Sequence, residues 1–168
     1  MRQTMSPEMP DRMAARICTA LAQAGVTVWI DGGWGVDALL GRQTRPHGDL
    51  DLVVAATDLE PLLARLDEMG FAVIDSPDQR AWNFVLGDDA GHRIDLHVVV
   101  FGTGGDGIYG PPENGESYPA AAFAGRGDLA GQQVRCMTAE FQIANRRGYA
   151  LRDVDLHDIR VLRDVFGI

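Results

Sequence analysis

The chain has 168 residues, a hydrophobic content of 46% and a formal net charge of −9, which suit one globular domain with a hydrophobic core. This acidic balance argues against a nucleic-acid partner, because proteins that grip nucleic acid need a basic surface to displace counterions. No apolar run is long enough to cross a bilayer, and residues 1–10 lack the apolar stretch of a secretory signal, so we expect a cytoplasmic protein with no membrane partner. Cys18 and Cys136 lack metal-type spacing and are expected to be two buried or idle thiols, with a disulfide as the less favoured alternative in the cytosol.

The sequence alternates between helix and strand signals. Apolar residues recur at helical spacing from Met13 to Leu21, Gly25 is a natural stop, and Thr57 with Glu60 has the spacing of a capping box. In chain order, the patterns predict a helix over 11–24, a strand over 26–30, a helix over 34–40, a strand over 49–54, a helix over 57–69, strands over 71–74, 81–86 and 92–101, a long functional loop or lid over 102–127, a strand over 129–136, and helices over 138–147 and 155–166.

These elements predict an α+β fold in which helices flank a mixed central sheet. Residues 1–10 are expected to form a flexible N-terminus. Residues 11–168 are expected to form a single domain that includes the two C-terminal helices.

An Asp-x-Asp pair begins the predicted strand over 49–54. Residues two apart on a strand point to the same face, so Asp49 and Asp51 would place two carboxylates side by side. Their repulsion is relieved by a cation, and Mg²⁺ prefers hard oxygen ligands of this kind. An isolated Asp-x-Asp can equally be two surface residues on an edge strand.

Two neighbouring features favour the metal interpretation. Asp31-Gly32-Gly33 follows a strand and precedes a short helix, where glycines allow a phosphate to approach the backbone N–H groups. A tight turn that needs a positive φ is the alternative. Asp95 lies among apolar residues of a later strand, where an unpaired carboxylate is costly. If that strand lies beside the Asp49 strand, three carboxylates meet.

The string from Trp29 to Asp37 carries a specific resemblance. Together with the residues that follow it, the string closely resembles the lincosamide nucleotidyltransferases and is similar to the aminoglycoside 2''-adenylyltransferases; those further residues are Gly41, Arg45, His47, Asp49 and Asp51. Both families belong to the DNA polymerase beta-like nucleotidyltransferase superfamily, whose signature is a Gly-Gly or Gly-Ser turn, then Asp-x-Asp, then a third acidic residue. The C-terminal part also resembles the short lincosamide enzymes, so the resemblance spans most of the chain and implies the fold of that superfamily.

The resemblance implies a role for each residue of the signature. Asp49 and Asp51 would hold Mg²⁺, with two ions expected, and Asp95 would be the third metal-binding carboxylate and the general base. Gly32 and Gly33 would contact the triphosphate of ATP or another nucleoside triphosphate.

Other polar and aromatic residues near the signature have two interpretations each. Arg45 is expected to bind phosphate, Arg42 either binds phosphate or pairs with Asp37, and Trp34 either lines the nucleotide pocket or belongs to the core. His47 is expected to support the turn before Asp49 through a backbone hydrogen bond, with metal binding as the alternative.

Further along the chain, His97 shares a face with Asp95 and either lines the acceptor pocket or is a surface histidine. His157 and Asp158 are explained adequately as capping residues of the last helix. Arg146 and Arg147 would be useful near phosphate, although arginines at a helix C-terminus need no such explanation.

These inferences predict an adenylyltransferase that moves a nucleoside monophosphate onto a hydroxyl of a small molecule and releases pyrophosphate. The acidic composition favours a cationic acceptor. A lincosamide- or aminoglycoside-like antibiotic is the predicted acceptor, and analogy suggests a homodimer. The alternatives are a toxin–antitoxin-type enzyme that modifies a protein and a non-catalytic nucleotide-binding domain.

Overall fold

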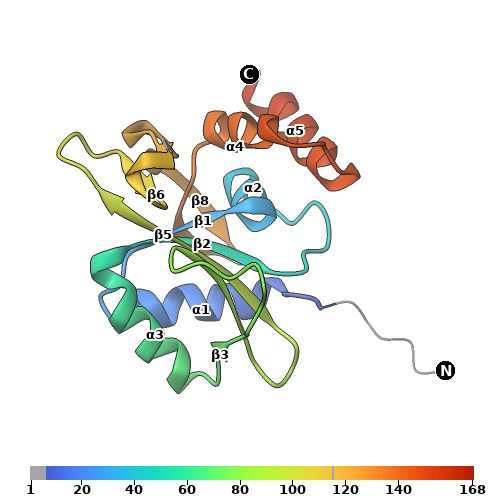
Figure 1. Cartoon of the computed structure of the whole chain (residues 1–168). Helices are drawn as coiled ribbons and strands as arrows, with labels where there is room; N and C mark the ends of the chain where they lie inside the picture. The colour runs from blue at the N-terminus through green and yellow to red at the C-terminus, as the bar shows by residue number, and fades with distance from the viewer. Residues whose placement is uncertain (1–6, 115) are drawn as a thin grey trace.

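A mixed sheet forms the centre of the molecule in the computed structural model, which describes residues 7–114 and 116–168 (Figure 1). The sheet runs in the order β3-β4-β5-β2-β1-β9-β8, with β6 paired to β5 and to β7. β2 runs parallel to β5 and antiparallel to β1, so the predicted mixed sheet is confirmed. The strands are β1 Val28–Asp31, β2 Leu50–Ala55, β3 Ala72–Val73, β4 Asn83–Gly87, β5 Arg93–Phe101, β6 Gly107–Tyr109, β7 Ser117–Tyr118, β8 Gly125–Leu129 and β9 Gln132–Cys136.

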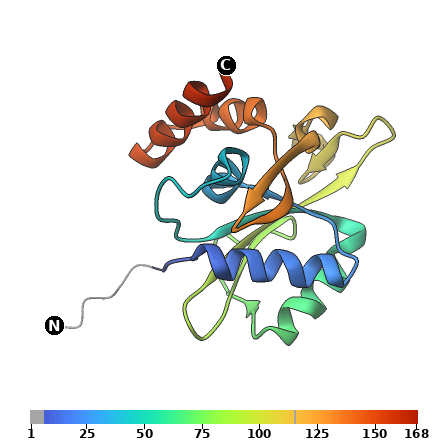
Figure 2. The ribbon, with the colours of Figure 1, turned by 180° about the vertical axis from the view of Figure 1, so that it is seen from behind.

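Helices cover both faces of this sheet. α1 Asp11–Gln23 and α3 Leu59–Glu68 lie on one face, and α2 Gly32–Leu40, α4 Ala139–Asn145 and α5 Asp153–Phe166 lie on the other (Figures 1 and 2). Short 3-10 turns connect some of these elements. Within the described residues, no helix combines the length and the apolar character that a membrane crossing requires.

The alternation of side chains along β2 and β5 separates the core from the polar face. One set of alternating residues packs into the main hydrophobic cluster, which also contains residues of α1 and α3: Leu50, Leu52 and Val54 of β2, and Ile94, Leu96 and Val98 of β5. Because successive side chains on a strand point to opposite faces, Asp51, Asp95 and His97 face the layer of α2, α4 and α5. The two buried cysteines are free, as predicted, and burial raises the pKa of each thiol to about 12.

The structure corrects two details near the N-terminus and α3. Residues 1–6 of the expected flexible end lie outside the described range. Met9, however, is buried, its N–H donates to the His47 carbonyl, and its own carbonyl accepts from Trp34 Nε1. The expected capping box of Thr57 and Glu60 is also absent from the described residues, because a 3-10 turn over Ala56–Asp58 precedes α3 and its N-cap Asp58 has no side-chain cap.

The segment 102–127 is not the long loop that its composition predicts. It contains β6, β7, a 3-10 turn over Ala120–Ala124 and the start of β8. The single strand expected over 129–136 is instead the second half of a hairpin. Ala130 and Gly131, both with positive φ, form its turn and allow β8 and β9 to pair antiparallel.

Candidate active site

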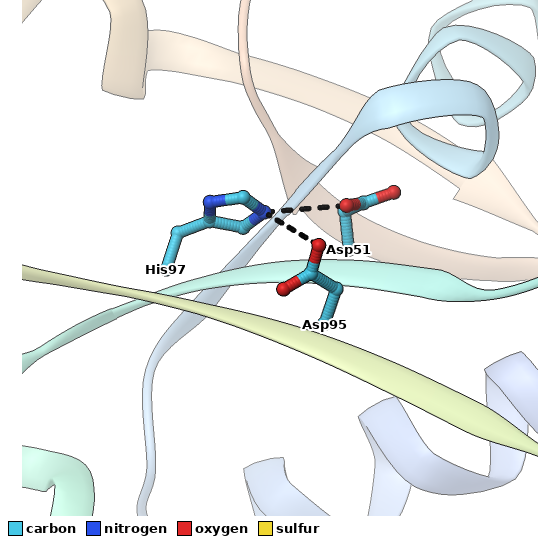
Figure 3. Close-up of side chains that lie close together, drawn as sticks. All are labelled: Asp51, Asp95 and His97. Carbon is cyan, nitrogen blue, oxygen red and sulfur yellow. Dashed lines mark hydrogen bonds and ion pairs between the residues drawn. The ribbon is translucent and has the colours of Figure 1, made fainter. Parts of the chain in front are cut away.

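Three aspartates lie in one row across the centre of the sheet. In the register of the strands, Asp31 of β1 faces Asp51 of β2, and Asp51 faces Asp95 of β5. Directly opposed residues on neighbouring strands share a face, so their carboxylates gather above the sheet. Figure 3 shows the Asp51 and Asp95 side chains converging with His97. The strand of Asp95 therefore lies beside the strand of the Asp-x-Asp pair, as the sequence interpretation requires.

A cavity of about 730 Å³ opens over this row. Its walls come from the turn at Gly32 and Gly33, the loop before β2, strand β5, and the helices α4 and α5. Among the predicted site residues it is lined by Gly32, Gly33, Arg45, Asp49, Asp51 and Asp95.

His97 binds the two central carboxylates. Its Nε2 lies 3.2 Å from Asp51 Oδ1 and 3.7 Å from Asp95 Oδ2. Burial disfavours the imidazolium, but the hydrogen bond and charge of Asp51 and the charge of Asp95 outweigh that effect and raise the pKa of His97 to about 9. Of the two interpretations from the sequence, His97 is part of the cavity and not an isolated surface residue.

Asp51, Asp95 and His97 offer a set of donor atoms for one cation. One ligand atom from each lies within 4.8 Å of the others. Carboxylate oxygens suit Mg²⁺, and an imidazole nitrogen is an additional donor once it is unprotonated. This arrangement of donors therefore fits a divalent cation.

Asp49 lies one residue before β2 and lines the same cavity. Its side chain reaches solvent, yet desolvation by the surrounding protein and the negative charges of Asp51 and Asp95 raise its pKa to about 7. The donor atoms of Asp49 are not in the closest group, which Asp51 and Asp95 form with His97. Its metal-binding role stays a prediction.

Asn83 of β4 fixes the orientation of Asp95. Its amide nitrogen donates to Asp95 Oδ1 at 2.7 Å and to the Leu96 carbonyl at 3.0 Å. Burial raises the pKa of Asp95 and so favours the neutral acid, whereas His97 and Asn83 stabilise the charged form. Asp95 is thus held in one rotamer with one oxygen, Oδ2, left toward His97.

The Gly-Gly turn brings the backbone of α2 close to the carboxylates. Asp31 caps α2 by accepting a hydrogen bond from the Gly32 N–H at 2.8 Å. Gly32 has a φ of +59°, and a Cβ there would overlap the Asp51 carboxylate. A Cβ on Gly33 would overlap the side chains of His47 and Arg45. The close packing around the cavity therefore requires glycine at both positions, whether or not a ligand approaches the turn.

A second, buried polar cluster supports the loop before β2. Asp37 Oδ2 bonds His47 Nε2 at 2.6 Å, and the backbone and hydroxyl of Thr44 donate to the same carboxylate. The ring of Trp34 packs on His47 at 4.4 Å between centroids. His47 therefore supports the turn through a side-chain bond to Asp37 as well as through its carbonyl, which accepts from Met9.

Helix α5 contributes two buried aspartates that hold arginines against the cavity. Asp158 receives two hydrogen bonds from Arg45, both of 2.9 Å, and one from Arg146 at 2.9 Å. Asp155 receives hydrogen bonds from Arg152 and Tyr149. The capping interpretation of Asp158 is wrong, because the residue lies inside α5 and binds arginine side chains.

Two predicted nucleotide-binding residues lie elsewhere. Arg42 is exposed, and Trp34 is 2% exposed with its Nε1 bonded to the Met9 carbonyl. Neither lines the cavity above the aspartates; both border a separate cavity of about 220 Å³. The core interpretation of Trp34 matches its position.

Sequence reasoning missed several residues of the cavity. The missed cavity residues are Asp31 as a fourth carboxylate, Gln142, Asp155 and Asp158. Asn83 does not line the cavity but was missed as the hydrogen-bond partner of Asp95. A signal existed for Asp31, which ends a strand beside a predicted Asp-x-Asp strand. Asp155 and Asp158 are three residues apart on one helix and so share a face. Nothing local marks Asn83 or Gln142, whose roles depend on tertiary contacts.

Comparison with known proteins gives a consistent result. The sequence model of the aminoglycoside-2''-adenylyltransferase family matches residues 14–162. A lincosamide resistance protein of Staphylococcus haemolyticus is 27% identical over 143 residues, which cover 83% of this chain and 86% of that protein. A 2''-aminoglycoside nucleotidyltransferase of Escherichia coli is 32% identical over 127 residues, which cover 74% of this chain and 66% of that protein.

Solved structures share the fold. The lincosamide antibiotic adenylyltransferase LnuA, crystallised with lincomycin, superposes with a TM-score of 0.81 at 24% identity and covers 94% of this chain and 99% of its own. ANT(2'')-Ia in complex with adenylyl-2''-tobramycin gives a TM-score of 0.73 at 23% identity and covers 94% of this chain and 89% of its own. The predicted nucleotidyltransferase fold is confirmed.

Proposed function

The chain belongs to the aminoglycoside-2''-adenylyltransferase family, and we propose that it transfers AMP from ATP to a hydroxyl of a lincosamide- or aminoglycoside-like antibiotic. It is a nucleotidyltransferase, as its relatives are. The observation that carries the specific reaction is the register of Asp31, Asp51 and Asp95 across three neighbouring strands, beside a Gly-Gly turn. Carboxylates fixed in this way form a site for divalent cations next to a site for phosphate.

The proposed reaction is an in-line attack of the acceptor hydroxyl on the α-phosphorus. The new oxygen–phosphorus bond forms as the bond to the β-phosphate oxygen breaks, and pyrophosphate leaves with that electron pair. Asp49, Asp51 and Asp95 would hold Mg²⁺, and two ions are expected. The bound ions would neutralise negative charge at the reacting phosphate.

Asp95 would receive the proton of the hydroxyl. Its raised pKa favours proton uptake, and its hydrogen bond from Asn83 holds the carboxylate in place as that proton arrives. The N–H groups at the start of α2 would receive the phosphates, because Gly32 and Gly33 keep this turn free of side chains. Arg45 lines the same cavity and would bind phosphate.

The acceptor class follows from the relatives and from charge. LnuA was crystallised with lincomycin, and ANT(2'')-Ia with an adenylylated tobramycin. In this chain four aspartates that are not bound to arginines line the sheet side of the cavity, which suits an acceptor that carries amino groups: Asp31, Asp49, Asp51 and Asp95.

Pyrophosphate release tests this proposal directly. The purified protein is assayed with each nucleoside triphosphate, Mg²⁺, and panels of lincosamides and aminoglycosides, and the product is identified by mass spectrometry as acceptor plus AMP. Asp51→Asn and Asp95→Asn should each lower turnover by about a thousandfold or more, because each removes a carboxylate that would hold the cation beside the reacting phosphate.

The control variant is Asp75→Asn, which changes an exposed aspartate outside the cavity. It should keep full activity, and circular dichroism should show that all three variants are folded. Wild-type turnover in both Asp51→Asn and Asp95→Asn would refute the assignment of the site.

A further inference from the structure

The segment 42–49, which joins α2 to β2, forms part of the cavity wall but has neither helix nor strand structure. It places the side chains of Arg45 and Asp49 at the cavity above the aspartates. Because no ladder or helix of hydrogen bonds fixes its backbone, its position depends on the side chains that hold it.

Asp37, in α2, is the centre of the bonds that hold this segment. It is 2% exposed, and its two oxygens receive the Thr44 N–H at 2.9 Å, the Thr44 hydroxyl at 2.6 Å and His47 Nε2 at 2.6 Å. Burial raises the pKa of Asp37, but the hydrogen bonds of His47 and Thr44 outweigh burial and lower that pKa below its ordinary value. Asp37 is therefore a buried carboxylate whose side-chain bonds all go to the segment.

His157 of α5 continues this series of bonds on the other side of the segment. Its Nε2 lies 2.9 Å from Thr44 Oγ1. A carboxylate can only accept, so the single hydroxyl proton of Thr44 goes to Asp37, and the hydroxyl oxygen accepts from His157. Each donor thus has one defined acceptor, from His157 through Thr44 to Asp37. Since His157 lies inside α5, the sequence interpretation of this residue as a helix cap is also wrong.

Asp37, Thr44 and His157 do not line the cavity above the aspartates. They can therefore affect a cation in that cavity only through the segment that they hold. If the segment moves, Asp49 moves with it, and only those molecules that have the segment in place offer the complete set of carboxylates. The apparent affinity for a cation is then reduced by that fraction.

We propose that the bonded residues His157, Thr44 and Asp37 act as a positioning chain for the cation site. They hold the segment 42–49 in one place and so keep Asp49 beside the carboxylate row. This inference rests on the proposed function, because it takes the carboxylate row as the cation site, and it links that site to α5. The bonds of the positioning chain are present without a cation, so the site is organised before a cation arrives.

Two pairs of variants test the positioning chain at different points. His157→Leu removes the outermost donor at a half-buried position, whereas His157→Gln keeps a donor nitrogen at the end of the side chain. Thr44→Val keeps the shape and removes the hydroxyl, whereas Thr44→Ser keeps the hydroxyl. His92→Leu is the matched control, because His92 is a half-buried histidine that bonds to Asp88 and lies outside both the cavity and the positioning chain.

The probe is Mn²⁺, added to EDTA-treated full-length protein without nucleotide or antibiotic. Electron paramagnetic resonance of the free ion gives the affinity. We expect His157→Leu to weaken Mn²⁺ binding by about threefold and Thr44→Val by about tenfold, because one and two hydrogen bonds are lost. His157→Gln and Thr44→Ser should recover most of the affinity, and His92→Leu should match the wild type.

Amide hydrogen exchange locates the effect in the structure. In His157→Leu and Thr44→Val, exchange should become faster in the segment 42–49 and stay unchanged in α1, which has no contact with the positioning chain. Circular dichroism confirms that each variant is folded. The two positions are independent, so one folded pair of variants is enough for the decision.

Two results would overturn the inference. One is wild-type Mn²⁺ affinity in the folded His157→Leu and Thr44→Val variants. The other is an equal loss in His157→Gln and Thr44→Ser, which would show that the side chains act by packing and not through their hydrogen bonds. A protein that shows the expected Mn²⁺ pattern, but transfers AMP to no antibiotic, supports the inference and refutes the proposed function.

Discussion

At the scale of single residues, the site depends on how closely backbone and side chains approach one another. Glycine is needed at position 32 for two reasons: the backbone φ is +59°, and a Cβ there would overlap the Asp51 carboxylate. Gly25 has a φ of +75°, but a Cβ at that position would meet nothing within 4 Å. Alanine substitutions at these two positions therefore distinguish two effects. Both substitutions strain the backbone, but only the one at Gly32 would also displace the Asp51 carboxylate.

We predict that Gly32→Ala abolishes transfer, whereas Gly25→Ala leaves transfer nearly unchanged. Both should lose about 1 kcal/mol of unfolding free energy from the strained backbone, because a left-handed conformation is unfavourable for alanine. Urea unfolding gives the stabilities, and pyrophosphate release gives the activity. Equal activity in the two variants would show that the approach of Gly32 to Asp51 has no role in the reaction.

The residues that the sequence alone could identify are those with a local signal. Asp49, Asp51 and the two glycines belong to a short, specific string, and all four line the cavity. Trp34 belongs to the same string and Arg42 lies close to it in sequence, but both lie outside the cavity, because proximity in sequence does not fix which way a helical or loop side chain points. Asn83 bonds to Asp95, 12 residues away in the sequence, and Gln142 reaches the cavity through helix packing. No local sequence pattern indicates either contact.

At the scale of elements, helix α5 acts through the carboxylates that it buries. The side chain and backbone N–H of Arg152, followed by Tyr149, hold the pKa of Asp155 at about 2, below its ordinary value of 3.8. A depressed carboxyl pKa stabilises the folded state above the unfolded pKa, and that contribution disappears as the pH falls through the folded pKa. The relevant window therefore lies between about pH 4 and pH 2.

We predict that Asp155→Asn lowers the unfolding free energy by about 1–2 kcal/mol at pH 7, a figure reduced because the Arg152 side chain is 71% exposed. The difference from the wild type should shrink as the pH falls from about 4 to 2. Asp153→Asn, at an exposed position in the first turn of α5, is the control. Chemical denaturation across this pH range measures both, and a difference that does not vary with pH would contradict the prediction.

Element boundaries show where sequence patterns are informative. β2 and β5 begin with an alternation of core and cavity residues, so both strands were predictable to within a residue or two. The segment 102–127 was not, because β6 and β7 have three and two residues and are too short for a periodic pattern. The turn at Ala130 and Gly131 was hidden for another reason, since alanine seldom adopts a positive φ.

At the scale of the whole molecule, the fold concentrates negative charge on the sheet side of one cavity, where four aspartates are poorly compensated: Asp31, Asp49, Asp51 and Asp95. Desolvation and the charges of Asp51 and Asp95 raise the pKa of Asp49 to about 7, and burial raises the pKa values of Asp31 and Asp95. A carboxyl with a raised pKa keeps its proton in the folded state after losing it in the unfolded state. The folded state then binds more protons, so the metal-free protein should lose stability as the pH rises from about 4 through 7. His97, with a pKa of about 9, continues this trend at higher pH.

We predict that divalent cations reverse this loss, and that their stabilising effect grows as the pH rises through about 7. Protons and metal ions compete for the same oxygens, so Mg²⁺ or Mn²⁺ should raise the melting temperature clearly at pH 8 and hardly at all at pH 5. Asp51→Asn should lose most of the increase, and Asp75→Asn should keep it, because of these two residues only Asp51 contributes a donor atom to the cavity. Thermal unfolding of EDTA-treated protein, with and without added cation at each pH, measures the effect. A cation-induced increase of equal size at pH 5 and pH 8, or in Asp51→Asn and the wild type, would mean that the ions bind elsewhere and that the carboxylate row is not the metal site.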